Sequence, residues 1–447
     1  MKRLTYLFLF TAVFYSVLAQ NPNKKTLDHS VYKDWKSVSK SVISSDGAFV
    51  SWEINPQQGD GALYLYRTEK DHTIQFPRAN NARFSYQSDL IAFRINPQSD
   101  TIRKMKFAKV KKDKLPKDSL GIYIFSIDSL IKIADLKSFK MAEEGSSWIA
   151  YLLEKTEPKE IQSEKADSLL SKAEKEELKK LNKKLKKQLN THLHILNPLT
   201  SEEVIFKHVK DYSVSKNGTI FLVKTMIKDS VDSLSIIIFN SLNVSSHELI
   251  KTAGDIKDFA VDEMGKQVAF IMSEDTSEIK NYSLYYAAAS ADKKAKKIVD
   301  VNNKHMPEGW NVSEHSNLSF SRNAKRIFFE TVPILPAEPE DSLLVEEKYS
   351  VDIWHWQDKR LQSQQIKSLE KDLKKNYRAV YFTDKKKMLQ LATEDVERVG
   401  IFDHGNGRYA LGYSRTKYQK AYSWSGSHYF DGYLIDLKTG KRTLILE

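Results

Sequence analysis

Cysteine is absent from the 447 residues. Without thiols the chain has no cysteine nucleophile, no thiolate metal site and no disulfide, so burial of apolar side chains must stabilise the fold. The motifs G-x-S-x-G, H-E-x-x-H, G-x-x-x-x-G-K-[ST] and G-x-G-x-x-G are absent too. These absences remove the commonest sequence signals of α/β-hydrolases, zinc peptidases and nucleotide-binding enzymes.

Only the first residues form a long apolar run. Lys2 and Arg3 precede the stretch from Leu4 to Leu18, and Ala19 supplies a small residue where a signal peptidase cuts. This pattern predicts a signal peptide over residues 1–19, cleaved after Ala19. A membrane anchor is the alternative, but about fifteen apolar residues are short for a span of roughly twenty. We expect an exported, periplasmic protein without stable membrane insertion after cleavage.

The formal net charge is +12. Much of it lies in residues 103–117, RKMKFAKVKKDKLPK, where eight basic side chains face one acid, Asp113. We interpret this strip as a loop-like, solvated or domain-facing surface. In an exported protein it does not indicate a nucleic-acid partner.

One pattern recurs along the chain: an apolar start, a short polar turn, and then alternating apolar residues. After ISSDGAFVSWEINP from Ile43, it appears as YSVSKNGTIFLVKT from Tyr212, FAVDEMGKQVAFIMS from Phe259, LSFSRNAKRIFFETV from Leu318 and GIFDHGNGRYALGYS from Gly400, with weaker copies from Phe84 and Met141. A second pair of alternating segments follows each copy, as in DGYLIDLKTGKRTLIL near the end. Alternation with period two marks half-buried strands, and the Asp/Asn-Gly dipeptides mark tight hairpins.

Two hairpins per unit predict a four-stranded antiparallel sheet, repeated about seven times. We therefore expect an all-β fold: a β-propeller over residues 41–447, possibly incomplete, after an N-terminal segment at 20–40. An array of β-sandwiches is the competing architecture, but it would not repeat the same turn chemistry in every unit.

Two segments interrupt the strand pattern. Residues 157–190 are rich in Glu, Lys and Leu, with leucines on one helical face, and predict a charged helical insertion. Residues 333–350 predict an acidic, proline-rich loop, and a short helix is expected from Gln362 to Tyr377.

Serine chemistry is not supported by the turns. Ser44 and Asp46 beside Gly47 suggest a catalytic pair, yet the same slot recurs as SKNG, DEMG, SRNA and DHGN without a constant serine. They are interpreted as turn residues. Ser425 and Ser427 flank Gly426 in WSGSHY, which is interpreted as a loop.

Histidines give equally weak signals. His192 and His194 lie two apart on an expected strand and so share one face; they could begin a zinc site, but no third ligand is apparent. His355 is expected opposite Trp354 and Trp356 on an alternating strand.

Acidic pairs and tryptophans are expected to be structural. The pairs Glu143-Glu144, Glu202-Glu203 and Glu346-Glu347 could bind a peptide's amino terminus in a propeller pocket, but we expect solvated turns or loops. Burial in strands is expected for most of the tryptophans, which are Trp35, Trp52, Trp148, Trp310, Trp354, Trp356 and Trp424. No catalytic, cofactor-binding or metal-binding residue is assigned.

Four longer segments carry a resemblance. They are LDHSVYKDWKSVSKSVISSDGAFVSWEINPQQGDGALYLY from Leu27, DKLPKDSLGIY from Asp113, GWNVSEHSNLSFSRNAKRIFFET from Gly309 and VDIWHWQDKRLQSQQIKSLEKDLKKNYRAVY from Val351. With these the chain resembles the large exported bacterial peptidases of the prolyl oligopeptidase family, over nearly all of its mature length. The resemblance implies an N-terminal β-propeller that restricts access to short peptides, followed by an α/β-hydrolase domain with a Ser-Asp-His triad.

Two functional interpretations follow. In the first, the chain is the substrate-gating part of such a serine peptidase, with peptide substrates and a C-terminal hydrolase domain in cis as partners. We expect that domain to be absent from this chain, which ends at Glu447 after a blade hairpin, so no catalytic residue is carried over. In the second, the chain is a free-standing periplasmic propeller that binds or scaffolds other molecules.

Overall fold

The computed structural model describes residues 28–155, 190–228, 231–276, 280–290, 294–334, 347, 349 and 351–447. The expected signal peptide, nearly all of the expected helical insertion and most of the acidic loop lie outside these residues. In the described part, no helix is long and apolar enough to cross a membrane.

The chain divides into two compact units. Among the described residues, unit 1 comprises 28–43, 47–82 and 93–116, and unit 2 comprises 44–46, 83–92 and the residues from 117 onward. The boundary passes through β5 (Ala79–Phe84) and β6 (Leu90–Ile95).

Unit 1 contains one complete four-stranded antiparallel sheet. Its strands β1 (Lys36–Ile43), β2 (Phe49–Pro56), β3 (Ala62–Arg67) and β4 (His72–Pro77) pair in chain order. The unit also holds the short 3₁₀ helices η1 (Tyr32–Asp34) and η2 (Lys112–Lys114) and the helix α2 (Ser99–Phe107). Part of the basic strip 103–117 is therefore helical, where the sequence predicted a loop; no residue of α2 is buried, so its charges are solvated.

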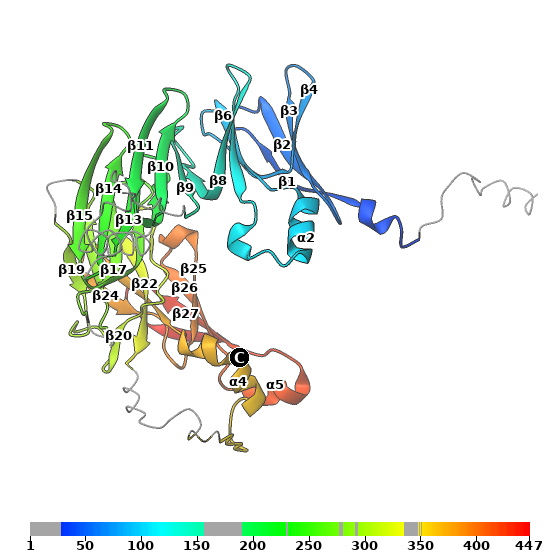
Figure 1. The fold of residues 1–447 in the computed structure, drawn as a ribbon. Coiled ribbons are helices and arrows are strands. Elements are labelled where there is room, and N and C mark those ends of the chain that lie inside the picture. The colour runs from blue at the N-terminus through cyan, green and yellow to red at the C-terminus, as the bar shows by residue number, and fades with distance from the viewer. Residues whose placement is uncertain are drawn as a thin grey trace, which may run out of the picture. The chain divides into compact units, whose positions relative to one another are not determined.

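Unit 2 contains sheets of the same kind (Figure 1). Their strands are β7 (Asp118–Ile124), β8 (Ser129–Met141), β9 (Ile149–Leu153), β10 (His192–Asn197), β11 (Glu202–Lys207), β12 (Val209–Val214), β13 (Ile220–Ile227), β14 (Ser233–Asn240), β15 (Ser245–Thr252), β16 (Asp255–Val261), β17 (Gln267–Ser273), β18 (Ser283–Ala288), β19 (Lys296–Val299), β20 (Trp310–Val312), β21 (Ser319–Phe320), β22 (Arg326–Pro333), β23 (Tyr377–Phe382), β24 (Lys387–Gln390), β25 (Arg398–Ile401), β26 (Tyr409–Ser414), β27 (Asp431–Asp436) and β28 (Arg442–Leu446). The helices are α4 (Gln362–Leu373), the 3₁₀ turn η5 (Asp403–Gly405) and α5 (Gln419–Ser425).

The long strand β8 serves two sheets. Its first part, Ser129 to Leu136, pairs with β7, and its last part, Leu136 to Met141, pairs with β9. The seven-stranded sheet β5 to β11 therefore consists of two four-stranded sheets that share the strand β8. The described residues form seven such sheets, called blades 1 to 7: β1–β4, β5–β8, β8–β11, β12–β15, β16–β19, β20–β24 and β25–β28. In blade 6 the short strands β20 and β21 both pair with β22 and together take the place of the first strand.

The hydrophobic cores lie between consecutive blades. Phe221 and Val223 of β13 pack against blade 3, whereas Ile220 and Leu222 of the same strand pack against blade 5. Further cores join blades 2 and 3, 5 and 6, and 6 and 7. Sheets that bury both faces against neighbouring sheets are the organisation of propeller blades. The predicted all-β class and the β-propeller are confirmed.

The two ends of each blade differ. The turns between the first and second strands span only five residues in five blades, such as 44–48, 215–219 and 262–266, and seven residues in blades 3 and 7. The four longest connections instead join the second strand to the third, and they include α2, α4 and α5. In an antiparallel sheet these two connections lie at opposite ends. We call them the turn end and the insertion end.

Candidate functional site

Ser44 and Asp46, which suggested a catalytic pair, lie in a turn between β1 and β2. The Ser44 hydroxyl donates to Asp46 Oδ1 at 2.6 Å, and Gly47 follows with φ of +74°. The same hydrogen bond recurs from Ser215 to Asn217 and from Ser321 to Asn323, at 2.8 Å in each. A local side-chain bond followed by a left-handed residue is ordinary turn chemistry. Ser44 and Asp46 are a turn, as predicted.

These turns are also bonded to one another within unit 2. The links, in blade order, are Asp46 N–H to Ser88 Oγ (3.3 Å), Ser147 Oγ to Asp89 (3.2 Å), Glu144 N–H to Lys216 O (2.8 Å), Asn217 N–H to Glu263 O (3.1 Å), Arg322 Nε to Glu263 (3.6 Å) and Arg322 N–H to His404 O (2.9 Å). Within unit 2, each turn is thus joined to the turn of the next blade, and we call this series of linked turns the turn chain. These contacts hold the turn ends, whereas the insertion ends carry the long connections and are the candidate functional surfaces.

The histidine pair lies on blade 3. His192 and His194 share one face of β10, as predicted; the His194 ring stacks on Tyr151 at 4.9 Å and its Nδ1 lies 2.9 Å from Glu203 Oε1. Tyr151 also donates to this carboxylate, at 2.8 Å. Burial and this hydrogen bond raise the pKa of Tyr151. The described residues bring no three metal-ligating side chains together here or elsewhere.

Two predictions about the tryptophans are wrong. Residues 351–361 form no strand, so His355 is not held opposite Trp354 and Trp356; both rings are exposed, and His355 lies 6.2 Å from the Trp356 ring. Burial holds for Trp148, which is 5% exposed, but not for Trp35, Trp354, Trp356 and Trp424, which are at least half exposed.

The acidic pairs mostly make structural contacts. Glu144 pairs with Lys216 at 2.8 Å in the turn chain, and Glu203 lies on strand β11 rather than in a turn. Glu346 lies outside the described residues.

Charged side chains also join one blade to the first strand of the next. In unit 2, Lys140 donates to Tyr212 O at 2.5 Å, Lys224 donates to Ile256 O, and Asp258 accepts from the Leu318 N–H at 2.7 Å. In unit 1, Glu53 accepts from the Asn81 N–H at 2.6 Å. Burial lowers the pKa of Lys224 to about 8 and raises that of Asp258. Lys224 and Glu53 are buried, whereas Asp258 is half-buried and Lys140 is exposed. Their hydrogen bonds join consecutive blades, although burial disfavours the charged forms of Lys224 and Asp258.

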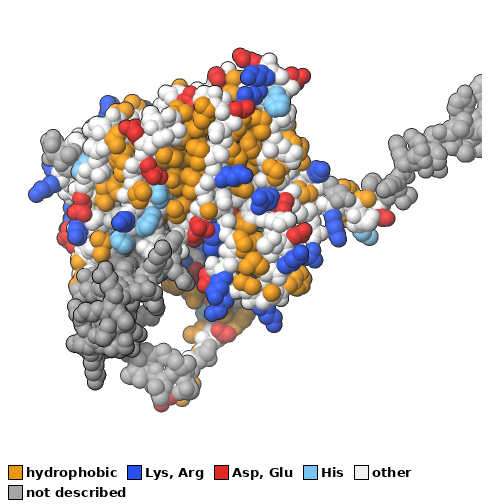
Figure 2. Space-filling model, turned by 45° about the horizontal axis from the view of Figure 1, so that its top comes forward, with side chains coloured by type: hydrophobic (Ala, Val, Ile, Leu, Met, Phe, Trp, Pro, Cys, Tyr) orange, Lys and Arg blue, Asp and Glu red, His pale blue; other side chains and the backbone are white. Residues whose placement is uncertain are grey.

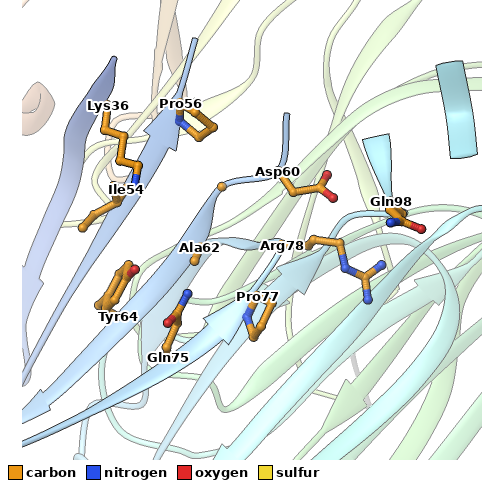
Figure 3. Close-up of a pocket in the computed structure, with 11 residues that line it drawn as sticks. Lys36, Ile54, Pro56, Asp60, Ala62, Tyr64, Gln75, Pro77, Arg78 and Gln98 are labelled. Atoms are coloured by element: carbon orange, nitrogen blue, oxygen red, sulfur yellow. The ribbon is translucent and has the colours of Figure 1, made fainter. Parts of the chain in front are cut away.

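Unit 1 has a hollow at its insertion end (Figure 3). It has a volume of about 520 Å³ and is lined by Lys36, Tyr64, Gln75 and Arg78, among others. Arg78 Nη1 donates to Asn96 O at 3.1 Å, and Asp60 accepts from the Ser99 N–H at 2.9 Å. Arg78 and Asp60 thus bond to nearby backbone groups, and we assign no catalytic or binding role to this hollow.

A larger hollow than that of unit 1 lies at the insertion end of blades 6 and 7. It has a volume of about 1150 Å³ and is bounded by α4, β25, α5 and residues 427–430 after α5; we call it the α4–α5 groove. Ser425 ends α5 and Gly426 caps it with φ of +66°, so the expected loop WSGSHY starts inside a helix. The glycine after an apolar-polar stretch could have revealed this helix.

Aromatic and basic side chains line the α4–α5 groove. Tyr422 stacks on His428 at 4.2 Å, and Tyr418 lies 5.9 Å from Tyr429. Beside it, a smaller hollow of about 240 Å³ holds Trp354, Trp356 and Trp424, and Lys420 lies over the Trp356 ring at 5.1 Å. Arg360 lines both hollows, so they are adjacent. Elsewhere, on the face shown in Figure 2, basic side chains are scattered among acidic ones.

No protein-family model and no curated protein matches the chain. Among solved structures, it is similar to the β-propeller domain of the Trilobed protease from Pyrococcus furiosus, with 10% identity, coverage of 92% of this chain and 98% of that chain, and a TM-score of 0.35. It is also similar to the Pyrococcus horikoshii acylaminoacyl peptidase (9% identity, 95% of this chain, TM-score 0.34) and spans 54% of that chain. A eukaryotic initiation factor has 10% identity, coverage of 91% and 78%, and a TM-score of 0.42. These neighbours include peptidase propellers, but the fold assignment rests on the cores between blades.

Proposed function

We propose that this chain is the substrate-gating propeller region of a serine peptidase of the prolyl oligopeptidase family that acts on short peptides. The supporting observation is that one of the segments resembling this family lies mostly outside the sheets. The resembling segment from Val351 covers the exposed Trp354-His355-Trp356 stretch and all of α4 before it reaches β23. Generic blade repeats account for similar strands, but not for a similar insertion outside the sheets.

Fixed blades suit such a role. The turn chain and the side-chain hydrogen bonds between blades hold consecutive blades together, while the insertion ends of the blades carry the long connections and the three hollows described above. A rigid scaffold that presents variable connections at one end is the usual arrangement of binding loops. The nucleophile, base and acid belong, in this proposal, to a hydrolase domain in cis.

The coding sequence beyond Glu447 tests this proposal. A reading frame that continues through further strands to a G-x-S-x-G motif is the expected result. A stop codon directly after Glu447 would contradict it and favour the free-standing propeller. Separately, the 447-residue chain should not react with a serine-directed fluorophosphonate probe, and stoichiometric labelling would show that a nucleophile is present in it.

Export is part of the proposal. The protein recovered from the periplasm should begin at Gln20, which N-terminal sequencing can determine. A protein recovered from the cytoplasm with an intact N-terminus would contradict the proposed location.

A further inference from the structure

We propose that the α4–α5 groove binds an extended acidic peptide segment, which pairs as an added strand with the free edge of β25. This binding site is distinct from the gating role and would exist whether or not the chain gates a peptidase. Three features of the groove favour such a ligand: an unpaired strand edge, an excess of positive charge and a row of tyrosines.

The first feature is the exposed edge of strand β25. β25 is the edge strand of its sheet and, among the strands that the structure describes, pairs only with β26. Arg398, Val399 and Gly400 are consecutive residues of β25, and all three line the groove. Because successive side chains of a strand point to opposite faces, three consecutive lining residues mean that the backbone edge itself borders the groove. An edge strand offers N–H and C=O groups to an incoming extended chain.

The positive charge of the groove favours an acidic peptide as the bound segment. Six basic residues line the groove against two acidic ones, Asp372 and Glu397. Both acids already have partners: Asp372 accepts from Arg360 at 2.7 Å, and Glu397 lies 3.4 Å from Lys375. Among the described residues, Lys371, Arg398 and Arg415 form no ion pair. Unpaired cations around a strand edge favour carboxylates on the bound segment.

The walls fit an extended peptide. Gln364, Ser368 and Lys371 of α4 recur at helical spacing and so share one face, and Lys375 follows just after the helix. Three tyrosines line the groove from the α5 side: Tyr418 directly before the helix, Tyr422 within it and Tyr429 after it. A peptide paired with β25 would direct alternate side chains towards each wall, so that acids meet cations and apolar side chains meet the tyrosine rings.

A designed peptide tests the inference directly. The probe is a fluorescein-labelled peptide of about eight residues that alternates glutamate and valine, long enough to pair with β25. Fluorescence anisotropy with the whole chain should show saturable binding that weakens with salt. The matched peptide with lysine in place of glutamate should bind at least about tenfold more weakly. Absence of binding by the acidic peptide would overturn the proposal.

Backbone methylation separates strand pairing from simple charge attraction. In a paired strand, the N–H groups of alternate residues point to the partner edge. N-methylation of one alternate set should therefore weaken binding about tenfold, and methylation of the other set should change it less than about twofold. Equal effects of the two sets, or no effect of either, would overturn strand addition.

Charge-reversed variants locate the site. Arg398→Glu and Arg415→Glu should each weaken binding about five- to tenfold, whereas Lys251→Glu, an exposed site on β15, is the matched control and should leave affinity unchanged. Thermal melting should show that all three variants fold. Alginate, a polymer of uronic acids, serves as a competitor. Displacement of the peptide by alginate at equal carboxylate concentration, or equal loss in the control, would contradict a peptide site in this groove.

Discussion

The ammonium group of Lys224 in β13 donates a hydrogen bond to the backbone carbonyl of Ile256 in β16 and lies 3.3 Å from Lys257 O. A cation of blade 4 thus ends on the first strand of blade 5, with only 4% of the residue exposed. Burial is the main cause that lowers its pKa to about 8 from an ordinary 10.5; the charges of Lys210, Asp211, Asp255 and Lys257 have smaller effects.

This relationship predicts a pH-dependent stability. From about pH 8 to about pH 10.5, folded Lys224 has released a proton that the unfolded chain still holds, so stability should rise with pH. The gain should approach about 3 kcal/mol. The variant Lys224→Met should lack it, and Lys251→Met should retain it. Urea denaturation over this pH range measures both, and a constant difference between wild type and Lys224→Met would contradict the prediction.

Glu330 should be far more important for stability than a surface ion pair. It is 4% exposed, accepts from Arg378 Nη2 at 2.7 Å and from Ser316 at 3.0 Å, and also accepts from the Asn317 N–H. Glu330→Ala leaves these donors unpaired and should cost about 2–3 kcal/mol.

The matched control for that experiment is Arg408→Ala. Arg408 pairs with Asp436 at 3.1 Å, but its side chain is 65% exposed. Its loss should cost less than about 1 kcal/mol. Equal costs in chemical denaturation would show that Glu330 does not hold its blade together as described.

Two glycines test the turn chain. Gly145 has φ of +86°, and a Cβ there would lie 2.5 Å from Asn217 O in the next blade's turn. Gly47 has φ of +74°, and a Cβ added there would have no neighbouring atom within 4 Å. Gly47→Ala should cost only the left-handed strain of about 1–2 kcal/mol. Gly145→Ala should cost clearly more, about 2–4 kcal/mol, because it also separates two turns. Equal melting temperatures of the two variants would argue against turn-to-turn contact.

Tryptophan fluorescence should report the exposed rings. Trp354, Trp356 and Trp424 are 64%, 75% and 73% exposed, whereas Trp148 is 5% exposed. Acrylamide should therefore quench two populations, and replacement of the three exposed rings by phenylalanine should remove most of the accessible one. If that variant kept the wild-type quenching curve, these rings would be buried in solution.

The blades were predictable because each carries its own signal. The turn chemistry at Ser44, Ser215 and Ser321 and the period-two alternation that follows depend only on neighbouring residues. The shared strand β8 was less visible, because its change of partner at Leu136 depends on two other strands.

The groove could not be predicted because it joins insertions of two blades. Alternation in VDIWHW indicated a strand, but residues 351–356 have no pairing partner and stay outside the sheet. α4 was found over Gln362–Leu373, although β23 already begins at Tyr377. Ser99 and Asp100 could have signalled the start of α2, since polar and acidic residues favour a helix N-terminus. The meeting of α4 with α5 depends on tertiary contacts alone.

The opposite placement of the turn chain and the long connections makes the chain a natural acceptor for grafted loops. A segment between the second and third strands can be lengthened, exchanged or randomised without touching the hydrogen bonds at Asn217 or Arg322 that order the blades. A library built at residues 415–430 would vary one wall of the groove while the frame beneath it keeps its register, much as antibody domains diversify their binding loops on a constant sandwich.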